Sequence, residues 1–577
     1  PLWASPLWAN RSAKLSTLNH GQGDTMTQTP ENTTNLLTIR DLEVSFTTMH
    51  GKVQAVEGAS MELPAGGTLA IVGESGSGKS TTAMATIGLL PGSGQVTSGS
   101  ILFDGQELVG LPEPKMRGIR GRQIGLVPQD PMSNLNPVSR IGTQISETLL
   151  THKLATKDTV KDQVIEVMTQ AGIPEPERRA KQYPHELSGG LRQRALIAIA
   201  LACKPKLLIA DEPTSALDVT VQQVILDQID SMTADLGTSV LLITHDLGLA
   251  AERAQNLVVM HRGKVVETGS ARQLLEDPQH PYTQSLVNAA PSVAATRLIA
   301  HEHKTEDTAT QEPEEKPLVE VSGLTKVYPI RGQDDFYAAK NVSLEIPRGK
   351  TVSIVGESGS GKTTTARMLL KLIEPTGGSI TFDGKDVLTL KGKDLRDFRQ
   401  RVQAVFQDPY SSLNPMFTVG KIIEEPLAAY KRGNATERRK RVLELMEQVA
   451  LPQHFYRRYP AELSGGQRQR ISIARALALN PDLIVCDEPV SALDVLVQDQ
   501  ILTLLKNLQE ELGLSYLFIS HDLAVVRLIS DYVCVMKDGE LVEAASSEEV
   551  FTNPRHPYTR KLLASIPGNE LGIEEAI

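Results

Sequence analysis

The chain has 577 residues with 40% hydrophobic content, a length too great for one ordinary core, so roughly two to four domains are expected. Its mean hydropathy of -0.17, and Lys204, Pro205 and Lys206 inside its most apolar stretch, argue against a membrane-spanning helix. A net charge of -10 disfavours a general nucleic-acid binder, and three scattered cysteines disfavour a disulfide scaffold, a zinc site or an iron–sulfur cluster.

The order of short motifs along the chain occurs twice, which indicates two copies of one domain. Glu212 and Glu488 lie 276 positions apart, whereas the lysines of two glycine-rich loops, Lys79 and Lys362, lie 283 apart. The first copy therefore carries about seven extra residues, which we expect in surface loops such as GLPEPKMRGIRGR.

Composition then divides the chain into five segments. The first 25 residues repeat Pro-Leu-Trp-Ala and precede Met26, so we interpret them as a non-native leader. An acidic, nearly apolar-free stretch between the copies predicts a flexible tether. The expected boundaries are a leader and disordered tail at 1–35, a first half at 36–291, an acidic linker at 292–317, a second half at 318–567 and a C-terminal tail at 568–577.

Within each half, short β-branched runs alternate with helical patterns, which predicts an α/β fold with a mostly parallel core sheet. The helix after Val219 has apolar residues at 221, 224, 225, 229, 232 and 236 and is expected to end at Gly237; its counterpart ends at Gly513. Patterns such as VKDQVIEVMTQAGI, before Ser188, predict an inserted α-helical subdomain.

The two glycine loops match GxxxxGK[ST] between a strand and a helix, the context in which this motif binds phosphate. Backbone N–H groups can surround a phosphate there, the lysine reaches the β- and γ-phosphates, and the hydroxyls of Ser80 and Thr363 can ligate Mg²⁺. The candidate nucleotide-binding residues are Gly73, Ser75, Gly76, Gly78, Lys79, Ser80, Thr81, Gly356, Ser358, Gly359, Gly361, Lys362, Thr363 and Thr364.

Acidic pairs end two apolar strands, in LLIADEP and LIVCDEP. Asp211 and Asp487 can organise Mg²⁺, and the adjacent Glu212 and Glu488 are placed to polarise a water for attack on the γ-phosphate. Paired acids are usually only a solvated turn, but the buried strand and the nearby phosphate loop favour catalysis.

His245 and His521 end the next strand, at one fixed offset from the glutamates, which favours a catalytic over a structural histidine. Two further stretches, ELSGGLRQR and ELSGGQRQR, place Ser-Gly-Gly at a helix start. That is either an N-cap or a second anion-binding end. The residues concerned are Ser188, Gly189, Gly190, Ser464, Gly465 and Gly466.

Taken together, these motifs resemble the ATP-binding subunits of ABC transporters over about residues 36–290 and 318–567, with SALD at 215–218 and 491–494 as a further match. The resemblance implies two tandem P-loop ATPase domains with short C-terminal extensions. They would pair head to tail, so that each ATP lies between one half's phosphate loop and the other half's LSGG. It further implies that Gln129 and Gln407 act in catalysis and at Mg²⁺. It also implies that Phe46 and Tyr328 stack on adenine, although each could be a strand core residue.

The stretches QDPMSNLNP and QDPYSSLNP, with DPQHPYTQSLVNAAP and NPRHPYTRKLLASIP, resemble the importer ATPases for oligopeptides, dipeptides and nickel. His280, Tyr282, His556 and Tyr558 are interpreted as a structural, proline-framed turn. The resemblance implies an ATP- and Mg²⁺-dependent ATPase at the cytoplasmic face of the membrane, held there by two integral permease subunits that work with an extracytoplasmic solute-binding protein, without nucleic acid.

Three alternatives stay open. The cargo could be nickel, glutathione or another small solute instead of a di- or oligopeptide. The chain could be a soluble tandem ATPase acting on ribosomes or DNA, although its linker is short and acidic and it lacks zinc-module cysteines. A regulatory scaffold without turnover is disfavoured because both Glu212 and Glu488 are present.

Overall fold

The computed structural model describes residues 35–48, 51–214, 217–290, 316–329, 334–408, 412–491 and 493–566. The expected leader, nearly all of the acidic linker and the C-terminal tail lie outside these residues. The description below therefore concerns the first half up to residue 290 and the second half from residue 316.

Each half is built on a six-stranded, mostly parallel sheet, as the sequence predicts. In the first half the strand order is β10-β9-β3-β8-β7-β6, and only β9 and β10 pair antiparallel. The second half repeats this order as β20-β19-β13-β18-β17-β16. Strand β7 is buried at every residue, as expected of a parallel strand covered on both faces. The six strands of the first half are β3 (Thr68–Val72), β6 (Ile124–Val127), β7 (Leu207–Asp211), β8 (Ser239–Thr244), β9 (Asn256–His261) and β10 (Lys264–Ser270). Those of the second are β13 (Thr351–Val355), β16 (Val402–Val405), β17 (Leu483–Asp487), β18 (Ser515–Ser520), β19 (Tyr532–Lys537) and β20 (Glu540–Ser546).

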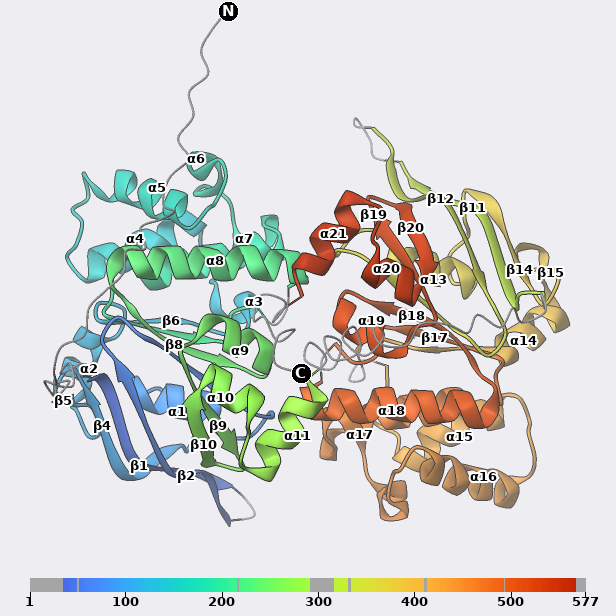
Figure 1. Ribbon diagram of the computed structural model, residues 1–577, viewed down its shortest axis with the longest axis horizontal. Helices are drawn as coiled ribbons and strands as arrows, with labels where there is room; N and C mark the ends of the chain where they lie inside the picture. The colour runs from blue at the N-terminus through green and yellow to red at the C-terminus, as the bar shows by residue number, and fades with distance from the viewer. Residues whose placement is uncertain are drawn as a thin grey trace, which may run out of the picture. The chain divides into compact units, whose positions relative to one another are not determined.

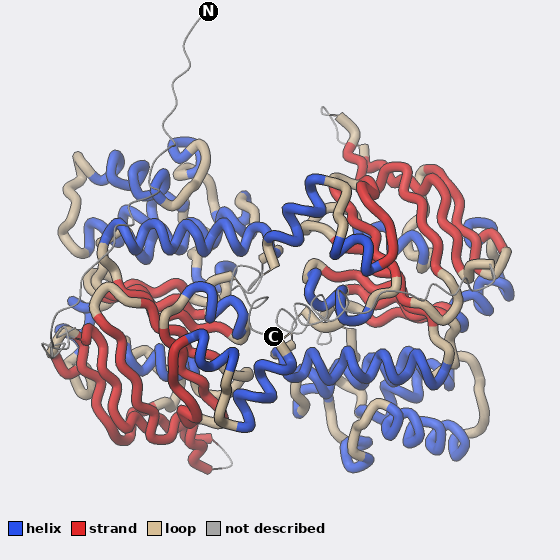
Figure 2. Tube along the Cα trace, viewed as in Figure 1, coloured by secondary structure: helices blue, strands red, loops and turns tan. Residues whose placement is uncertain are grey.

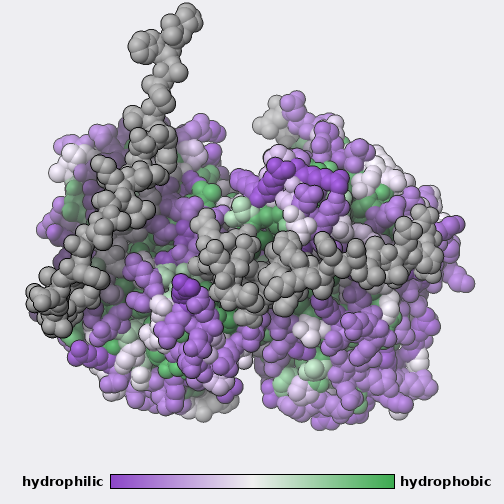
Figure 3. Space-filling view, viewed as in Figure 1, coloured by the Kyte–Doolittle hydropathy of each residue, from purple (hydrophilic) through white to green (hydrophobic). Residues whose placement is uncertain are grey.

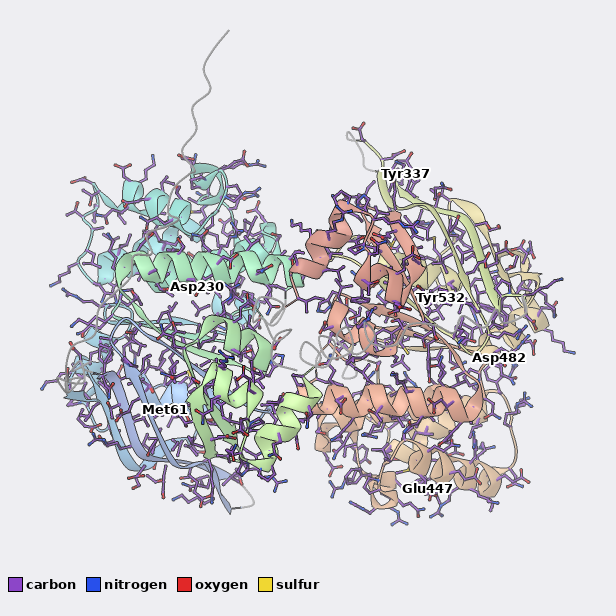
Figure 4. The ribbon with its side chains drawn as sticks, viewed as in Figure 1. Met61, Asp230, Tyr337, Glu447, Asp482 and Tyr532 are labelled. Carbon is purple, nitrogen blue, oxygen red and sulfur yellow. The ribbon has the colours of Figure 1, made fainter. Side chains whose placement is uncertain are left out.

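A second, four-stranded antiparallel sheet accompanies each core sheet and was not predicted. Its order is β2-β1-β4-β5 in the first half and β12-β11-β14-β15 in the second. Alternating buried residues on β2, among them Met61 (labelled in Figure 4), pack into the same hydrophobic cluster as residues of the core sheet. The strands are β1 (Asn35–Thr48), β2 (Gly51–Pro64), β4 (Gln95–Phe103), β5 (Gln106–Glu107), β11 (Val319–Tyr328), β12 (Phe336–Ile346), β14 (Gly377–Phe382) and β15 (Lys385–Asp386).

The predicted α-helical subdomain lies between the phosphate loop and β7 in the chain, and its helices gather to one side of the strands of the same half (Figures 1 and 2). It packs on the core sheet, because Ile141, Ile145 and Met168 share one hydrophobic cluster with Val127 of β6 and Leu208 of β7. The helices are α3 (Pro131–Asn134), α4 (Ile141–Thr151), α5 (Val160–Gln170), α6 (Pro176–Arg179) and α7 (Gly189–Leu201), with α15 (Val419–Ala429), α16 (Ala435–Gln448) and α17 (Gly465–Leu477) in the second half.

The remaining helices cover the sheets and join the strands. They are α1 (Lys79–Thr86), α2 (Glu113–Ile119), α8 (Val219–Leu236), α9 (Leu247–Arg253), α10 (Ala271–Glu276) and α11 (Pro281–Ala289) in the first half. The second half has α13 (Lys362–Leu369), α14 (Gly392–Arg401), α18 (Val495–Leu512), α19 (Leu523–Ile529), α20 (Ser547–Thr552) and α21 (Pro557–Ala564).

Helix α8 ends where the sequence predicts, with Gly237 as a left-handed C-cap at φ 64°. The apolar stripe is narrower than predicted, because Val224 is 47% exposed. Arg253 of α9 donates hydrogen bonds to Asp227 and to Asp230 (labelled in Figure 4), at 2.6 and 2.9 Å, and so ties the helix that follows β8 to α8.

The expectation that GLPEPKMRGIRGR is a surface loop is wrong in part. Residues Glu113–Ile119 form α2, and Met116 and Ile119, three positions apart, are buried on one face. This spacing places both side chains on the core-facing side of a short helix. The prolines at its start are compatible with the first turn of a helix.

Among the described residues, no helix combines the length and apolarity needed to cross a bilayer. On the face seen in Figure 3, the described residues are mostly hydrophilic.

Candidate functional site

The glycine loop of the first half joins β3 to α1 and folds back on its own lysine. Lys79 is 5% exposed, and its ammonium donates hydrogen bonds to the carbonyl oxygens of Gly73 and Glu74 at 2.6 and 2.9 Å. Burial lowers the pKa of Lys79, and the nearby carboxylates of Glu212 and Asp494 partly offset this effect. Lys362 repeats the arrangement at 2.7 and 2.8 Å. The lysines are therefore held inside the loops.

The loop fits a phosphate. Helix α1 follows Gly78, whose φ of 103° suits glycine, and no side chain caps the helix and no acid lies in its first turn. The Ser77 hydroxyl is buried and has no hydrogen-bond partner among the described residues. A Cβ on Gly73 would lie 2.1 Å from the Met260 carbonyl oxygen, so only glycine fits there. Uncapped N–H groups at a helix start favour an anion.

The loop is followed by a hydroxyl–carboxylate pair that suits a hard cation. Ser80 donates to Asp211 at 2.9 Å, and Thr363 donates to Asp487 at 3.1 Å. Burial raises the pKa of Asp211, and the Ser80 hydrogen bond partly offsets this rise. Oxygen donors of this kind match the preference of Mg²⁺, so these residues fit the ion.

Glu212 lies at the centre of a polar cluster at the end of β7. Its carboxylate accepts a hydrogen bond from Gln129 Nε2 at 2.6 Å and lies 3.2 Å from His245 Nδ1. Its backbone has φ 46°, a left-handed conformation that is strained for a residue with a side chain. The structure therefore brings Glu212, Gln129 and His245, all expected to act in catalysis, into contact.

Glu212 and His245 shift each other's pKa in the directions expected of an ion pair. Burial would raise the pKa of Glu212, but the hydrogen bond and charge of His245, with the charge of Lys79, outweigh it and lower this pKa. Burial would likewise lower the pKa of His245, but Glu212, together with the charges of Asp246 and Asp494, raises it. Each residue therefore favours the charged form of the other.

The second half builds the same cluster. Glu488 accepts from Gln407 at 2.7 Å, lies 3.3 Å from His521 Nδ1 and has φ 48°. A pocket between the halves is lined by Glu212 and His245 of the first half and by His521 of the second.

Both LSGG stretches begin helices, as predicted. Ser188 is the N-cap of α7 and Ser464 the N-cap of α17, and each hydroxyl accepts from a backbone N–H three residues on, at 3.4 and 3.3 Å. Gly466 is buried, and a Cβ there would lie 2.3 Å from Val497 Cγ1. A Cβ on Gly190 would likewise lie 2.9 Å from Val221 Cγ1. The N-cap residue Ser188 is exposed.

Hydrogen bonds cross between the halves at the phosphate loops. The Ser75 N–H donates to Asp494 at 2.8 Å, and the Ser358 N–H donates to Asp218 at 2.9 Å. Asp494 and Asp218 occupy the N-cap positions of α18 and α8, but neither side chain caps its own helix. Each carboxylate contacts the opposite loop.

The two loops differ in one contact across the halves. Glu357 accepts a hydrogen bond from Thr220 of the first half at 2.8 Å. The matching position in the second half is Leu496, which cannot donate, and Glu74 lies instead 3.0 Å from His261 Nδ1 in its own half. This distance is short, but the geometry is not that of an aligned hydrogen bond.

The predicted adenine-stacking residues lie on the antiparallel sheets. Phe46 of β1 is half-buried, and a Cβ on Gly94 would lie 2.6 Å from its ring. Tyr328 of β11 is 42% exposed, with Lys326 Nζ 5.2 Å above its ring. Their role stays a prediction, as do those of Thr81 and Thr364 in the first turns of α1 and α13.

Sequence reasoning underestimated two kinds of residue. The motifs include Asp218 and Asp494 only as part of SALD, and they predict that Tyr282 and Tyr558 are turn residues. The available signal was repetition: each residue recurs at the offset of 276 that relates the glutamates.

Comparisons with known proteins agree with the motifs. The ABC transporter family matches residues 56–215 and 339–491, and the family described as "Oligopeptide/dipeptide transporter, C-terminal region" matches 266–316 and 542–576. The protein named "Glutathione import ATP-binding protein GsiA" from Salmonella choleraesuis is 44% identical over 92% of this chain and 90% of its own length. Its namesake from Escherichia coli has the same identity and coverage.

Proposed function

Because this chain belongs to the ABC transporter family, as an importer ATP-binding protein with two ATPase domains in tandem, we propose that it powers the uptake of small peptides through two ATP sites shared between its halves. The observation that carries the proposal of shared sites is the reciprocal pair of hydrogen bonds, Ser75 to Asp494 and Ser358 to Asp218.

Each shared site would draw on both halves. At the first, the Lys79 loop binds the phosphates, and the LSGG of the opposite half, Ser464 to Gly466, closes over the γ-phosphate. At the second, Lys362 is completed by Ser188 to Gly190. Two observations support this arrangement. The serines are the N-caps of α7 and α17, and the carboxylates of Asp494 and Asp218 each accept a hydrogen bond from the phosphate loop of the other half.

Hydrolysis would follow from the cluster around Glu212. Its carboxylate, kept ionised by His245, accepts a hydrogen bond from the attacking water and orients it. Gln129 fixes the second carboxylate oxygen. Lys79 offsets the charge that develops on the phosphates, and Mg²⁺, held through Ser80 and Asp211, supplies further neutralisation when bound.

Two permease subunits would hold the chain at the cytoplasmic face of the membrane and would work with a solute-binding protein outside it. The segments that follow Gln129 and Gln407 are suited to docking because they present apolar side chains to solvent. Met132, Val138 and Met416 are 60%, 83% and 79% exposed.

The cargo class is proposed from the C-terminal regions and the relatives. The matching family is described for oligopeptide and dipeptide transporters, and the relatives are named for glutathione, itself a small peptide. Nickel is the alternative cargo. A role on ribosomes or DNA draws no support from these comparisons.

The test is uptake by the complete transporter. The chain would be reconstituted with its permease subunits and solute-binding protein in proteoliposomes containing ATP and Mg²⁺. We expect ATP-dependent accumulation of labelled small peptides, with glutathione and Ni²⁺ tested in parallel. Uptake of Ni²⁺ alone would reject the peptide proposal, and uptake that persists with Lys79→Ala/Lys362→Ala would reject the proposed engine.

A further inference from the structure

The HPYT segment of each half reaches the phosphate loop of the same half. The backbone N–H of Glu74 donates a hydrogen bond to the Tyr282 hydroxyl at 3.0 Å, although 208 positions separate them. The N–H of Glu357 donates to the Tyr558 hydroxyl at 3.1 Å. The same contact therefore occurs at both loops.

Tyr282 is held firmly on the side away from the loop. His280 Nδ1 caps α11 by accepting from the Tyr282 N–H at 3.2 Å. The Glu267 carboxylate on β10 accepts from the N–H groups of Gln279 and His280 at 2.8 and 3.0 Å. In the second half, Glu543 takes the place of Glu267 and binds the N–H groups of Arg555 and His556 at the same two distances.

Each ring is buried and each hydroxyl stays protonated. Tyr282 and Tyr558 are 9% and 7% exposed. Burial raises the pKa of both hydroxyls to about 12, despite the opposing N–H contact. A neutral hydroxyl is thus available as an acceptor at physiological pH.

The residue that contacts the tyrosine also contacts the lysine. Glu74 gives its N–H to Tyr282 and its carbonyl oxygen to Lys79, at 2.9 Å. Moving this residue would move the ammonium that meets the phosphates. Glu357 links Tyr558 to Lys362 in the same way, at 2.8 Å from its carbonyl oxygen to the ammonium.

Both halves have the hydrogen bond from the loop to the tyrosine hydroxyl, although the two tyrosine rings have different neighbours. His261 stacks on Tyr282 with centroids 4.0 Å apart, whereas Lys537 lies 5.1 Å above the Tyr558 ring. Packing around the ring differs between the halves, but the hydrogen bond to the loop does not. This indicates that the hydroxyl, and not the ring packing alone, serves the loop.

We propose that Tyr282 and Tyr558 are positioning residues of the two phosphate loops, each fixing by its hydroxyl the peptide that follows the loop's first glycine. The HPYT segment then has a role in ATP binding beyond that of a structural turn. The inference rests on the proposed assignment of the Lys79 and Lys362 loops as the ATP sites.

The test removes one hydroxyl at a time and reads each site separately. Tyr282→Phe keeps the buried ring but leaves the Glu74 N–H without its acceptor. Affinity for a fluorescent trinitrophenyl-ATP would be measured in two backgrounds, Lys362→Ala and Lys79→Ala, each of which leaves one loop intact. We expect Tyr282→Phe to weaken binding about three- to tenfold in the Lys362→Ala background, the value of one hydrogen bond, and to have no effect in Lys79→Ala.

Tyr558→Phe should show the opposite pattern. Tyr516→Phe is the matched control, because the Tyr516 hydroxyl also bonds to backbone, Leu505 O at 3.0 Å, but in the core. It should lower thermal stability without changing either affinity. A merely structural role for Tyr282 would give that same result.

The outcomes separate the two proposals. If Lys79→Ala/Lys362→Ala binds the analogue as the parent does, the loops are not the ATP sites and both proposals fall. If this double variant loses binding but Tyr282→Phe and Tyr558→Phe match the parent, or weaken both backgrounds equally, only the positioning role is overturned.

Discussion

The carboxylate of Asp494, in the second half, accepts a hydrogen bond from the backbone N–H of Ser75, in the first half, at 2.8 Å. The negative charge of Asp494 also acts on Lys79 and His245 of the first half. One residue of the second half therefore contributes to the electrostatics of the first half's phosphate loop.

Replacing Asp494 with Ala should impair the Lys79 site and spare the Lys362 site. The Ser75 N–H loses its acceptor, and an isolated hydrogen bond to a charged group stabilises by about 1.5–3 kcal/mol. We expect ATP affinity to fall roughly tenfold or more in the Lys362→Ala background by this estimate. In the Lys79→Ala background, Asp494→Ala should change little. Asp218→Ala is the matched control and should reverse the pattern.

Substituting Glu212 and Glu488 with Gln should abolish turnover while ATP still binds. The amide keeps the shape of the side chain but cannot act as a base, a loss worth about 10²- to 10⁴-fold in rate. Steady-state phosphate release and equilibrium ATP binding measure the two effects separately. Near-normal phosphate release by the double variant would show that neither glutamate orients the water.

Glu212→Gln should also lower the pKa of His245. In the parent, the pKa of His245 is raised above its ordinary value and that of Glu212 is lowered. The pair therefore stabilises the fold between these values. Its contribution is lost as pH rises through the raised pKa of His245, and also as pH falls through the lowered pKa of Glu212.

Without Glu212, burial dominates at His245, which disfavours the charged imidazole. An NMR titration of protein labelled with ¹⁵N-histidine, with His245→Ala for assignment, measures the change. A His245 pKa that is the same in Glu212→Gln as in the parent would contradict the ion pair.

Gly466→Ala should destabilise the second half. Its Cβ would lie 2.3 Å from Val497 Cγ1, and overpacking of this kind costs about 1–3 kcal/mol. Gly377→Ala is the control, since a Cβ there has no neighbour within 4 Å. Thermal unfolding measures both variants. The combination Gly466→Ala/Val497→Ala should recover part of the loss, and a loss that Val497→Ala leaves unchanged would point to another cause.

Local patterns predicted the parts of the site that lie close together along the chain. The position of Lys79 follows from the glycine motif, and the ends of α8 and α18 follow from Gly237 and Gly513. The contact between Ser80 and Asp211 was predictable because parallel strands bring both side chains to one edge of the sheet.

Contacts set by tertiary packing were not predictable in this way. Tyr282 meets Glu74 only because β9, β10 and α11 place it beside a loop 208 positions earlier. The sequence places Asp494 in SALD but does not reveal that its carboxylate faces the other half. The antiparallel sheets were missed because β1 pairs not only with the adjacent β2 but also with β4, which follows the phosphate loop in the chain.

The central claim, that each ATP site is shared between the halves, is tested most directly by counting trapped nucleotides. In the Glu212→Gln/Glu488→Gln background we expect two ATP molecules retained per chain. Adding Ser464→Arg, which blocks the LSGG of the second half, should leave one. Combined with Lys79→Ala it should still leave one, because both changes disable the same site. Combined with Lys362→Ala it should leave none. The reverse result, none with Lys79→Ala and one with Lys362→Ala, would mean that each LSGG serves its own half and would contradict the account.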